Sequence, residues 1–372
     1  MIRVLHCFGS MNIGGAETLI MNIYRKIDKS KIQFDFLVFN KVKGYFDDEI
    51  KLLGGKVYCL ESLGTLGPYK FKKNLMKFFK EEKINCIHSH MDWQGGFIAE
   101  AATKAGVKRI IVHSHAMSSL YSDSMIKKIM INKGKRLIKK YATDRLACSI
   151  DAGKDLFIED KFEMLNNAID VQKFLNFDQN RVNEFRKQFG INKEDFVIGH
   201  VGSFSENKNQ EFLVEILDEV RKKCPNSKLL FIGRKNKYQD KVKKIVKQKE
   251  MDEFVVFAGV QTDISDLLQL MDVFVFPSIT EGFGISIIEA QAAGIPCVIS
   301  DTIPKSVDMG LKIVKRESLD NIEDWVIDIL KDNKTILDKK IIRQKIRENE
   351  FDLELLVTKI ENFYLQYSKY LL

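Results

Sequence analysis

Two glutamates bracket a glycine-containing turn in the second half of the chain. Glu281 and Glu289 lie in the stretch SITEGFGISIIEAQAAGIPCVIS, residues 278–300, which has the pattern of a strand end, a glycine loop, a helix, a turn and a strand. A helix that begins near Ile285 leaves its first backbone N–H groups unpaired, and such groups bind anions. The stretch therefore predicts an anion site with a carboxylate on either side.

The two carboxylates would repel a phosphate that touched them, so they are better suited to accept hydrogen bonds from hydroxyl groups. Because a helix rises about 1.5 Å per residue, their separation in sequence allows up to roughly 12 Å between them. A ligand with hydroxyls at both ends and an anion between them fits this layout, and a nucleotide diphosphate sugar is such a ligand. The alternative is an ordinary helix that carries two surface glutamates.

Two further glycine-containing loops follow predicted strands and precede predicted helices. HVGSFSENKNQEF, residues 200–212, places Lys208 at the opening of a helix, where a cation beside free N–H groups favours an anion. The alternative is an ordinary exposed lysine. GSMNIGGAET, residues 9–18, lacks both the Lys and Ser/Thr of a phosphate loop and the G-x-G-x-x-G of a dinucleotide fingerprint. It is either a tight turn or a loop whose glycines let a ligand come close.

Four of the six histidines lie in two H-S-H triplets, and each triplet ends a predicted strand. Alternation places His88 and His90 on one face of the sheet, and likewise His113 and His115. A metal site is conceivable, but no carboxylate or cysteine keeps the usual spacing nearby, so no metal ion is expected. Because strand carboxyl ends face the ligand in open α/β sheets, the last histidine of a triplet is a candidate ligand contact.

Short β-branched or aromatic runs alternate with longer amphipathic runs through both halves of the chain. Runs such as IRVLHCF and FVIGHVGSF are each followed by a loop and a helical pattern, which is typical of a parallel sheet wrapped by helices. We therefore predict an α/β protein with two consecutive Rossmann-like, doubly wound domains and a binding cleft between them. The first domain, the second domain and a C-terminal helix are expected at residues 1–170, 171–350 and 351–372.

The composition is that of a globular protein in a reducing compartment. Of the 372 residues, 45% are hydrophobic and 30% are charged, and no apolar run is long enough to span a membrane. The N-terminal MIRVLHCFGS has the pattern of a buried strand rather than of a signal peptide. The six cysteines lack metal-type spacing and are expected to be free thiols. These features predict a cytoplasmic protein.

The positive charge is concentrated in the first half of the chain. Residues 1–170 hold 28 Lys and Arg against 19 Asp and Glu, whereas the remaining residues hold 31 against 32. This asymmetry indicates an anionic partner for the first half. Two basic, partly apolar helical stretches, residues 69–83 and 125–141, either bury one face on the sheet or rest on an anionic membrane surface.

Several motifs together resemble one enzyme family. Glu281 and Glu289, with seven residues between them, match the E-x₇-E motif of the retaining glycosyltransferases of family four, which have the GT-B fold. GGAE, NAID and VGSFSENKN also resemble that family, and the likeness extends over almost the whole chain, including a C-terminal helix that crosses back to the first domain. IIVHSH and ACSIDAGKDLF are most similar to the branch that builds bacterial capsule and exopolysaccharide.

The resemblance implies a role for each matching residue. Glu289 would accept hydrogen bonds from the nucleotide ribose, and Lys208 would neutralise the diphosphate. Glu281 and His115, or less readily His113, would contact the donor sugar. The remaining donor-binding positions are Gly14 and Gly15, which would line the phosphates, the backbone around Gly282, Phe283, Gly284, Ile285 and Ser286, and Ser203. The catalytic set that the resemblance implies is Glu281, Lys208 and His115.

The resemblance also implies an activity. The family transfers a sugar with retained anomeric configuration and without a metal ion or cofactor, here a hexosyl unit from a UDP-sugar to a saccharide, lipid-linked acceptor. No nucleic-acid partner is implied. One position departs from the family pattern: Ser203 stands where a second diphosphate-binding arginine is usual. Two alternatives remain open, a nucleotide-sugar epimerase of the same fold and a non-catalytic subunit of a glycosyltransferase pair.

Overall fold

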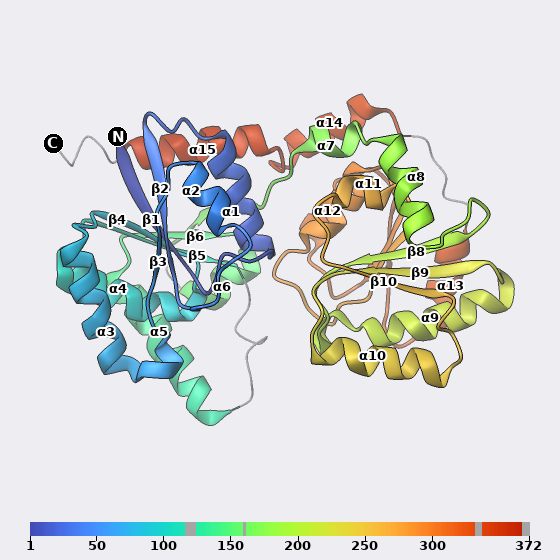
Figure 1. Cartoon of the computed structure of the whole chain (residues 1–372), viewed down its shortest axis with the longest axis horizontal. Helices are drawn as coiled ribbons and strands as arrows, with labels where there is room; N and C mark the ends of the chain where they lie inside the picture. Colours follow the sequence, from blue (N-terminus) through green and yellow to red (C-terminus); the bar gives the residue numbers. More distant parts are fainter. Residues whose placement is uncertain (116–123, 159–160, 332–336, 367–372) are drawn as a thin grey trace. The chain divides into compact units, whose positions relative to one another are not determined.

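Two parallel β-sheets organise the chain, one in each of two structural units (Figure 1). The computed structural model describes residues 1–115, 124–158, 161–331 and 337–366. Unit 1 comprises Met1–Ala168 together with Leu353–Leu372, and unit 2 comprises Ile169–Asp352. The C-terminal segment therefore belongs to the same unit as the N-terminus.

The sheet of unit 1 has seven strands in the order β3-β2-β1-β4-β5-β6-β7, and every paired neighbour is parallel. Most of its strand residues are buried, as expected for a sheet covered by helices on both faces. The strands are β1 Ile2–Phe8, β2 Ile32–Val38, β3 Val57–Cys59, β4 Cys86–Ser89, β5 Arg109–Ser114, β6 Asp144–Ala147 and β7 Glu163–Met164.

Two apolar cores hold helices against the two faces of this sheet. One core packs α1, α2 and α15 on one face, and the other packs α3, α4, α5 and α6 on the opposite face (Figure 1). The C-terminal helix α15 thus covers the sheet beside α1. The helices are α1 Gly15–Lys26, α2 Asp47–Leu52, α3 Leu63–Glu81, η1 Asp92–Gln94, α4 Gly95–Ala105, α5 Met125–Tyr141, α6 Ile150–Phe157 and α15 Leu353–Leu365.

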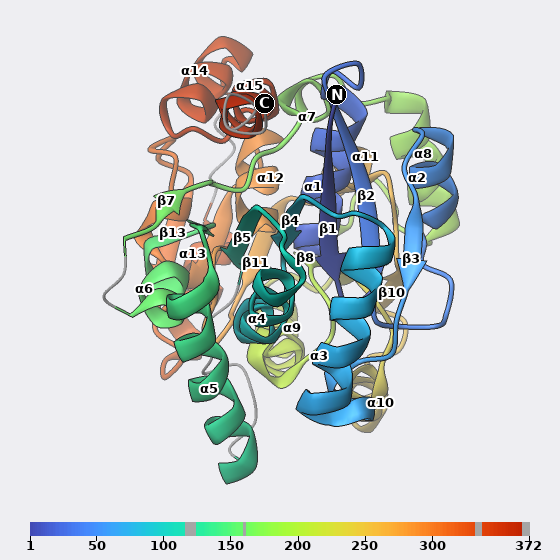
Figure 2. The same cartoon turned by 90° about the vertical axis from the view of Figure 1, so that its left-hand side faces the viewer.

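Helix α5 approaches its neighbours through glycine. A Cβ at Gly134 would lie 2.1 Å from the carbonyl oxygen of Trp93, and one at Gly96 would lie 2.2 Å from that of Gly134. Only glycine allows this backbone contact between α5 and the η1–α4 segment. The first turns of α5 extend away from the sheet (Figure 2), and Met125, Ile126 and Ile129 are exposed there.

The sheet of unit 2 has six parallel strands in the order β10-β9-β8-β11-β12-β13. One core packs helices α9, α10 and α13 against one of its faces. The strands are β8 Phe196–Val201, β9 Ser227–Ile232, β10 Val255–Gly259, β11 Val273–Phe276, β12 Cys297–Ser300 and β13 Val314–Glu317. The helices are α7 Val171–Leu175, α8 Gln179–Gln188, η3 Glu206–Lys208, α9 Gln210–Lys223, α10 Lys237–Gln248, α11 Ile264–Leu268, α12 Ile285–Ala292, η4 Lys305–Val307, α13 Ile322–Leu330 and α14 Lys339–Glu348.

Both strand orders reverse direction at one point, between β1 and β4 in unit 1 and between β8 and β11 in unit 2. At such a switch point the loops after the two central strands leave in opposite directions and form a crevice for ligands. The site residues predicted from the sequence follow these strands, or in the case of His115 the adjacent strand β5. The fold class predicted from the sequence is confirmed: two Rossmann-like sheets with a C-terminal helix that returns to the first.

Two short strands were not expected from the sequence, β7 at the edge of the first sheet and β13 at the edge of the second. Both contain charged residues and lack an apolar run, because an edge strand is not buried on both sides. Among the described residues all six cysteines are free, and Cys59 is exposed. None of the described helices is both long and apolar enough to cross a bilayer.

Candidate functional site

The loops that leave β8 and β11 bring Lys208 to Glu281. The Lys208 Nζ atom donates to Glu281 Oε1 at 2.5 Å, and it lies 4.5 Å from the centre of the Phe276 ring. Both side chains are largely buried. Glu281 therefore has a basic partner, although it lies 73 positions earlier in the sequence.

Asn207 ties the same two loops together through the main chain. Its carbonyl oxygen accepts from the N–H of Ile279 at 2.8 Å, and its side-chain amide donates to the carbonyl of Thr280 at 2.6 Å. These bonds flank the Lys208–Glu281 ion pair and fix the spacing of the loops. Asn207 was not among the candidates from the sequence, because a lone asparagine in a loop gives no signal of a long-range partner.

Helix α12 begins at Ile285, as the sequence predicted, and its N-terminus has no side-chain cap. Gly284, at the cap position, has a φ of +93°, a conformation that favours glycine. Phe283 is buried and packs edge-on against Phe351, with ring centres 5.5 Å apart. The first N–H groups of α12 are therefore fixed in position, and no capping side chain accepts from them. Such N–H groups suit an anion.

Glu289 lies one turn into α12 and is half-buried. Within the described part of the chain its carboxylate accepts no hydrogen bond and forms no ion pair. Burial without compensation raises its pKa to about 7. A carboxylate in this state is a strong acceptor for hydroxyl groups that a ligand brings.

Ser203 is exposed just after β8. Two buried side chains, His200 and Gln210, hold the loop that contains it. His200 Nδ1 lies 3.0 Å from the carbonyl oxygen of Val275, which makes it the donor, and His200 Nε2 lies 3.4 Å from Gln210 Nε2. Gln210 also donates to the Ser203 carbonyl at 3.1 Å and accepts from the Ser205 N–H at 3.2 Å. These two side chains position the loop and were missed by the sequence analysis.

In unit 1, Gly14 and Gly15 lie where β1 passes into α1, with Gly14 at the uncapped N-terminus of the helix. The carboxylate of Glu17 lies against Gly14, because a Cβ placed on that glycine would be 2.4 Å from Glu17 Oε2. Apart from its chain neighbours and the backbone of its own helix, no described atom lies within 4 Å of a Cβ placed on Gly15. An anion can therefore approach the Gly15 side of the loop more readily than the Gly14 side.

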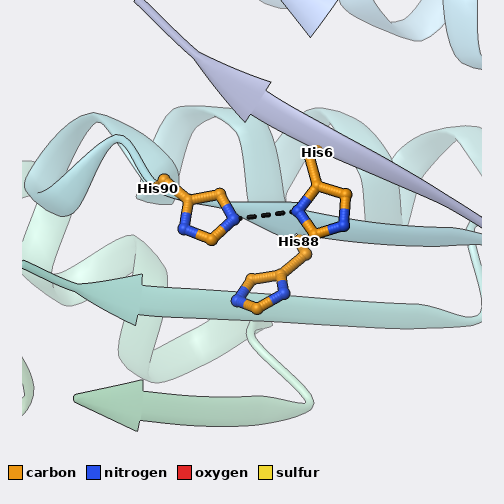
Figure 3. A group of neighbouring side chains, drawn as sticks. All are labelled: His6, His88 and His90. Carbon is orange, nitrogen blue, oxygen red and sulfur yellow. Dashed lines mark hydrogen bonds between the residues drawn. The ribbon is translucent and has the colours of Figure 1, made fainter. Parts of the chain in front are cut away.

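The histidines of unit 1 form one buried cluster across β1, β4 and β5. His90 Nε2 lies 3.0 Å from His6 Nδ1 (Figure 3), and His90 Nδ1 lies 2.8 Å from His115 Nε2. His88 Nδ1 bonds the Tyr364 hydroxyl of α15 at 2.6 Å. Burial lowers the pKa of His6 to about 3 and that of His115 to about 4, so these rings are neutral at physiological pH.

The two histidines considered as sugar contacts differ in burial and in hydrogen bonding. The His113 ring is fully buried, and neither of its nitrogens has a partner among the described residues. His115 is half-buried just beyond the end of β5, and its Nδ1 has no described partner. The alternation argument holds, since the rings of His88 and His90 stack at 4.2 Å.

Two histidine triplets in this cluster have nitrogens close enough for a shared metal ion, His6 with His88 and His90, and His90 with His113 and His115. Metal binding needs in-plane lone pairs that converge on one point. The rings of His88 and His90 instead stack with only 29° between their planes (Figure 3), so their lone pairs run side by side. In the first triplet the stacked rings of His88 and His90 therefore favour hydrogen bonding over convergence on one metal ion.

The chain has two doubly wound units, which is the architecture of the GT-B glycosyltransferases. The chain belongs to the family described as glycosyl transferases group 1, whose model matches residues 181–349. It is 38% identical over 323 residues to the Bacillus subtilis (strain 168) protein named as glycosyltransferase EpsF, covering 85% of this chain and 84% of that protein.

Two further relatives are more distant. The capsular polysaccharide biosynthesis glycosyltransferase CapH of Staphylococcus aureus is 26% identical, with 78% of this chain and 79% of CapH aligned. The Escherichia coli UDP-Gal:α-D-GlcNAc-diphosphoundecaprenol α-1,3-galactosyltransferase is 25% identical, with 90% of this chain and 89% of the enzyme aligned. Among solved structures, Anabaena HepE in complex with UDP-glucose superposes with a TM-score of 0.78 at 20% identity, covering 98% of this chain and all of HepE.

Proposed function

We propose that the protein is a retaining, metal-independent hexosyltransferase that moves a sugar from a UDP-sugar to a lipid-linked saccharide during capsule or exopolysaccharide synthesis. The observation that carries this proposal is the half-buried Glu289 carboxylate, which has no partner among the described residues and lies next to the uncapped start of α12. The Glu289 carboxylate can accept hydrogen bonds from hydroxyls, and the first N–H groups of α12, one helical turn away, can donate to an anion. This pair of groups matches a ribose joined to a diphosphate.

The residues can stabilise a departing diphosphate without a metal ion. Negative charge develops on the leaving oxygen as the glycosidic bond breaks, and fixed positive groups at that position lower the barrier. The α12 N–H groups and Lys208 provide such groups, because both are held in place before the ligand arrives. Glu281 orients Lys208 and offers its other oxygen to hydroxyls of the sugar.

A front-face departure and attack fits the side chains that are available. Glu281 is already bonded to Lys208, so it is better suited to recognise hydroxyls than to act as a nucleophile. His115 in unit 1 offers a neutral ring with one open nitrogen as a second contact for the donor sugar. The choice of UDP is supported by the two similar proteins whose names or bound ligands specify UDP-sugars.

The lipid-linked acceptor is supported by the surface of α5. Met125, Ile126 and Ile129 are 73%, 76% and 61% exposed, and Lys127 and Lys128 lie between them. Apolar side chains interleaved with lysines suit the interface of an anionic membrane, which each basic residue favours by about 1 kcal/mol. The Escherichia coli relative is named for a diphosphoundecaprenol acceptor, which such a membrane would hold.

The function is tested by incubating the purified protein with UDP-glucose, UDP-galactose or UDP-N-acetylglucosamine and a synthetic saccharide on a lipid diphosphate. We expect UDP release from one of these donors only when the acceptor is present, and a product of retained configuration. Glu289→Ala should lower donor affinity roughly 10- to 100-fold. Glu323→Ala, at an exposed glutamate of α13, is the matched control and should bind the donor normally.

Other outcomes would identify the alternative functions. Conversion of one UDP-sugar into another without acceptor would indicate an epimerase and contradict the proposal. Donor binding without turnover for every acceptor, combined with activity on addition of a second glycosyltransferase, would indicate a non-catalytic subunit.

Membrane association has its own test, sedimentation with liposomes. Wild-type protein should sediment with anionic but not neutral vesicles at low salt and be released at high salt. The double variant Lys127→Glu/Lys128→Glu should lose this binding, whereas Lys243→Glu/Lys244→Glu in α10 carries the same charge change and should keep it. Equal behaviour with anionic and neutral vesicles would contradict a membrane surface as partner.

A further inference from the structure

The three histidines His6, His90 and His115 form a continuous chain of hydrogen bonds. It starts at His6 in the middle of β1, passes through His90 just after β4, and ends at His115 just after β5 (Figure 3 shows the first link). The links are 3.0 Å and 2.8 Å long. A neutral imidazole has one N–H and one bare nitrogen, so it donates through one nitrogen and accepts through the other.

Because His90 uses both of its nitrogens, only two proton arrangements satisfy the chain. In the outward arrangement, His6 Nδ1–H donates to His90 and His90 Nδ1–H donates to His115 Nε2. The proton of His115 is then on Nδ1, the nitrogen without a described partner. In the inward arrangement, every bond is reversed, and His115 Nδ1 is bare.

The two arrangements differ in what they leave in the core. His6 Nε2 is buried and has no described partner. The inward arrangement puts a proton on this atom and so creates an orphaned buried N–H, which is rarer in proteins than an unpaired acceptor. The outward arrangement leaves only a lone pair there, and it is therefore favoured.

Hydrogen bonds fix the main chain of His115, so the contacts of its ring decide which ring nitrogen carries the proton. Its N–H donates to Asp92 Oδ1 at 2.8 Å, and its carbonyl accepts from the Cys148 thiol at 3.6 Å. The His113 ring packs on one side of it with centres 4.0 Å apart but makes no hydrogen bond to it. The 2.8 Å bond from His90 is the contact that selects which nitrogen of His115 carries the proton.

We propose that His90 is a positioning residue that holds His115 in the Nδ1–H tautomer, so that His115 presents a hydrogen-bond donor to an oxygen of the donor sugar. This inference rests on the proposed function for the identity of the ligand, but the tautomer is a property of the unliganded protein. Without His90, the His115 ring would be free to take the Nε2–H form and turn an acceptor toward the sugar.

The proposal is tested by long-range ¹⁵N–¹H correlation spectra of histidine-labelled protein at pH 7.5, which identify the protonated nitrogen of each ring. Wild-type His115 should be in the Nδ1–H form. It should change in His90→Leu and stay unchanged in His113→Leu, which also removes a ring that touches His115 but breaks no hydrogen bond. His90→Asn, whose amide can donate from near the position of Nδ1, should restore much of the Nδ1–H form.

Turnover gives the second readout. His90→Leu should lower kcat/KM for the donor about tenfold, the effect of one lost hydrogen bond, without changing the affinity for UDP alone. An Nε2–H form of His115 in the wild type, or an unchanged tautomer in folded His90→Leu, would overturn the inference. A changed tautomer with unchanged kcat/KM would overturn the positioning role. A wild-type protein without transferase activity would refute the proposed function, while the spectra would still decide the tautomer.

Discussion

Donor affinity should depend on pH through a single carboxylate, Glu289. Burial raises its pKa to about 7, and within the described part of the chain it has no hydrogen-bond partner. Ribose hydroxyls donate more strongly to a carboxylate than to a carboxylic acid, so a bound nucleotide favours the ionised form. Donor binding should therefore strengthen as pH rises through 7 and should release a proton below that pH.

The size of the effect follows from the ionised fraction. With a pKa of about 7, roughly a tenth of the molecules carry the carboxylate at pH 6 and roughly nine-tenths at pH 8. Affinity should thus rise up to about tenfold over this interval, or about 1.4 kcal/mol. The stability of the unliganded protein should move in the opposite direction, because its folded state binds more protons than the unfolded state between pH 4.5 and 7. That loss is at most about 3 kcal/mol, since the side chain keeps some contact with water.

The assay is calorimetric titration with a UDP-sugar at pH 6, 7 and 8. A nucleotide sugar is preferred to UDP, whose terminal phosphate itself titrates near pH 6. Glu289→Gln is the control, because it keeps the shape and removes the charge. It should bind weakly at all three pH values, and its melting temperature should fall less between pH 5 and 8 than that of the wild type. A wild-type affinity that stays flat, or a glutamine variant that keeps the pH dependence, would refute the reasoning.

Three further perturbations have defined outcomes. Ser203→Arg should raise donor affinity about tenfold by adding a charge-assisted contact at an exposed position, whereas Ser203→Gln should not; weaker binding by the folded arginine variant would contradict this. EDTA should leave turnover intact, since helix N–H groups and Lys208 supply the positive charge; a loss that manganese or magnesium restores would show a metal requirement. Gly134→Ala should destabilise unit 1 by about 1–3 kcal/mol in thermal melting, because its Cβ would lie 2.1 Å from a Trp93 oxygen. Gly64→Ala on α3, whose Cβ would meet only Ser62 Oγ at 3.8 Å, should not destabilise the protein, and equal melting of the two variants would refute the packing argument.

The sequence predicted the features that local patterns encode. Alternating apolar runs located the central strands, and the two glycines beside Glu281 located the start of α12 at Ile285. Contacts that depend on the order of strands in the sheet could not be predicted from the sequence. The pairing of His6 with His90 joins residues 84 positions apart, and only the adjacency of β1 and β4 brings them together. Asn207 and His200 were missed for the same reason, since their partners Thr280 and Val275 are brought to them by β8 lying beside β11.

The ion pair between Lys208 and Glu281 shows why this long-range information matters for the reaction. In the unliganded protein the lysine is neutralised by a carboxylate 2.5 Å away, so a diphosphate has to compete for it. That competition weakens ground-state binding. Under the proposed mechanism, Glu281 would compete less effectively as charge builds on the leaving oxygen, because the diphosphate would attract the lysine more strongly in the transition state than in the substrate complex. A cation held in this way contributes more to turnover than to affinity. We therefore expect Glu281 to influence kcat through Lys208 as well as through the sugar hydroxyls.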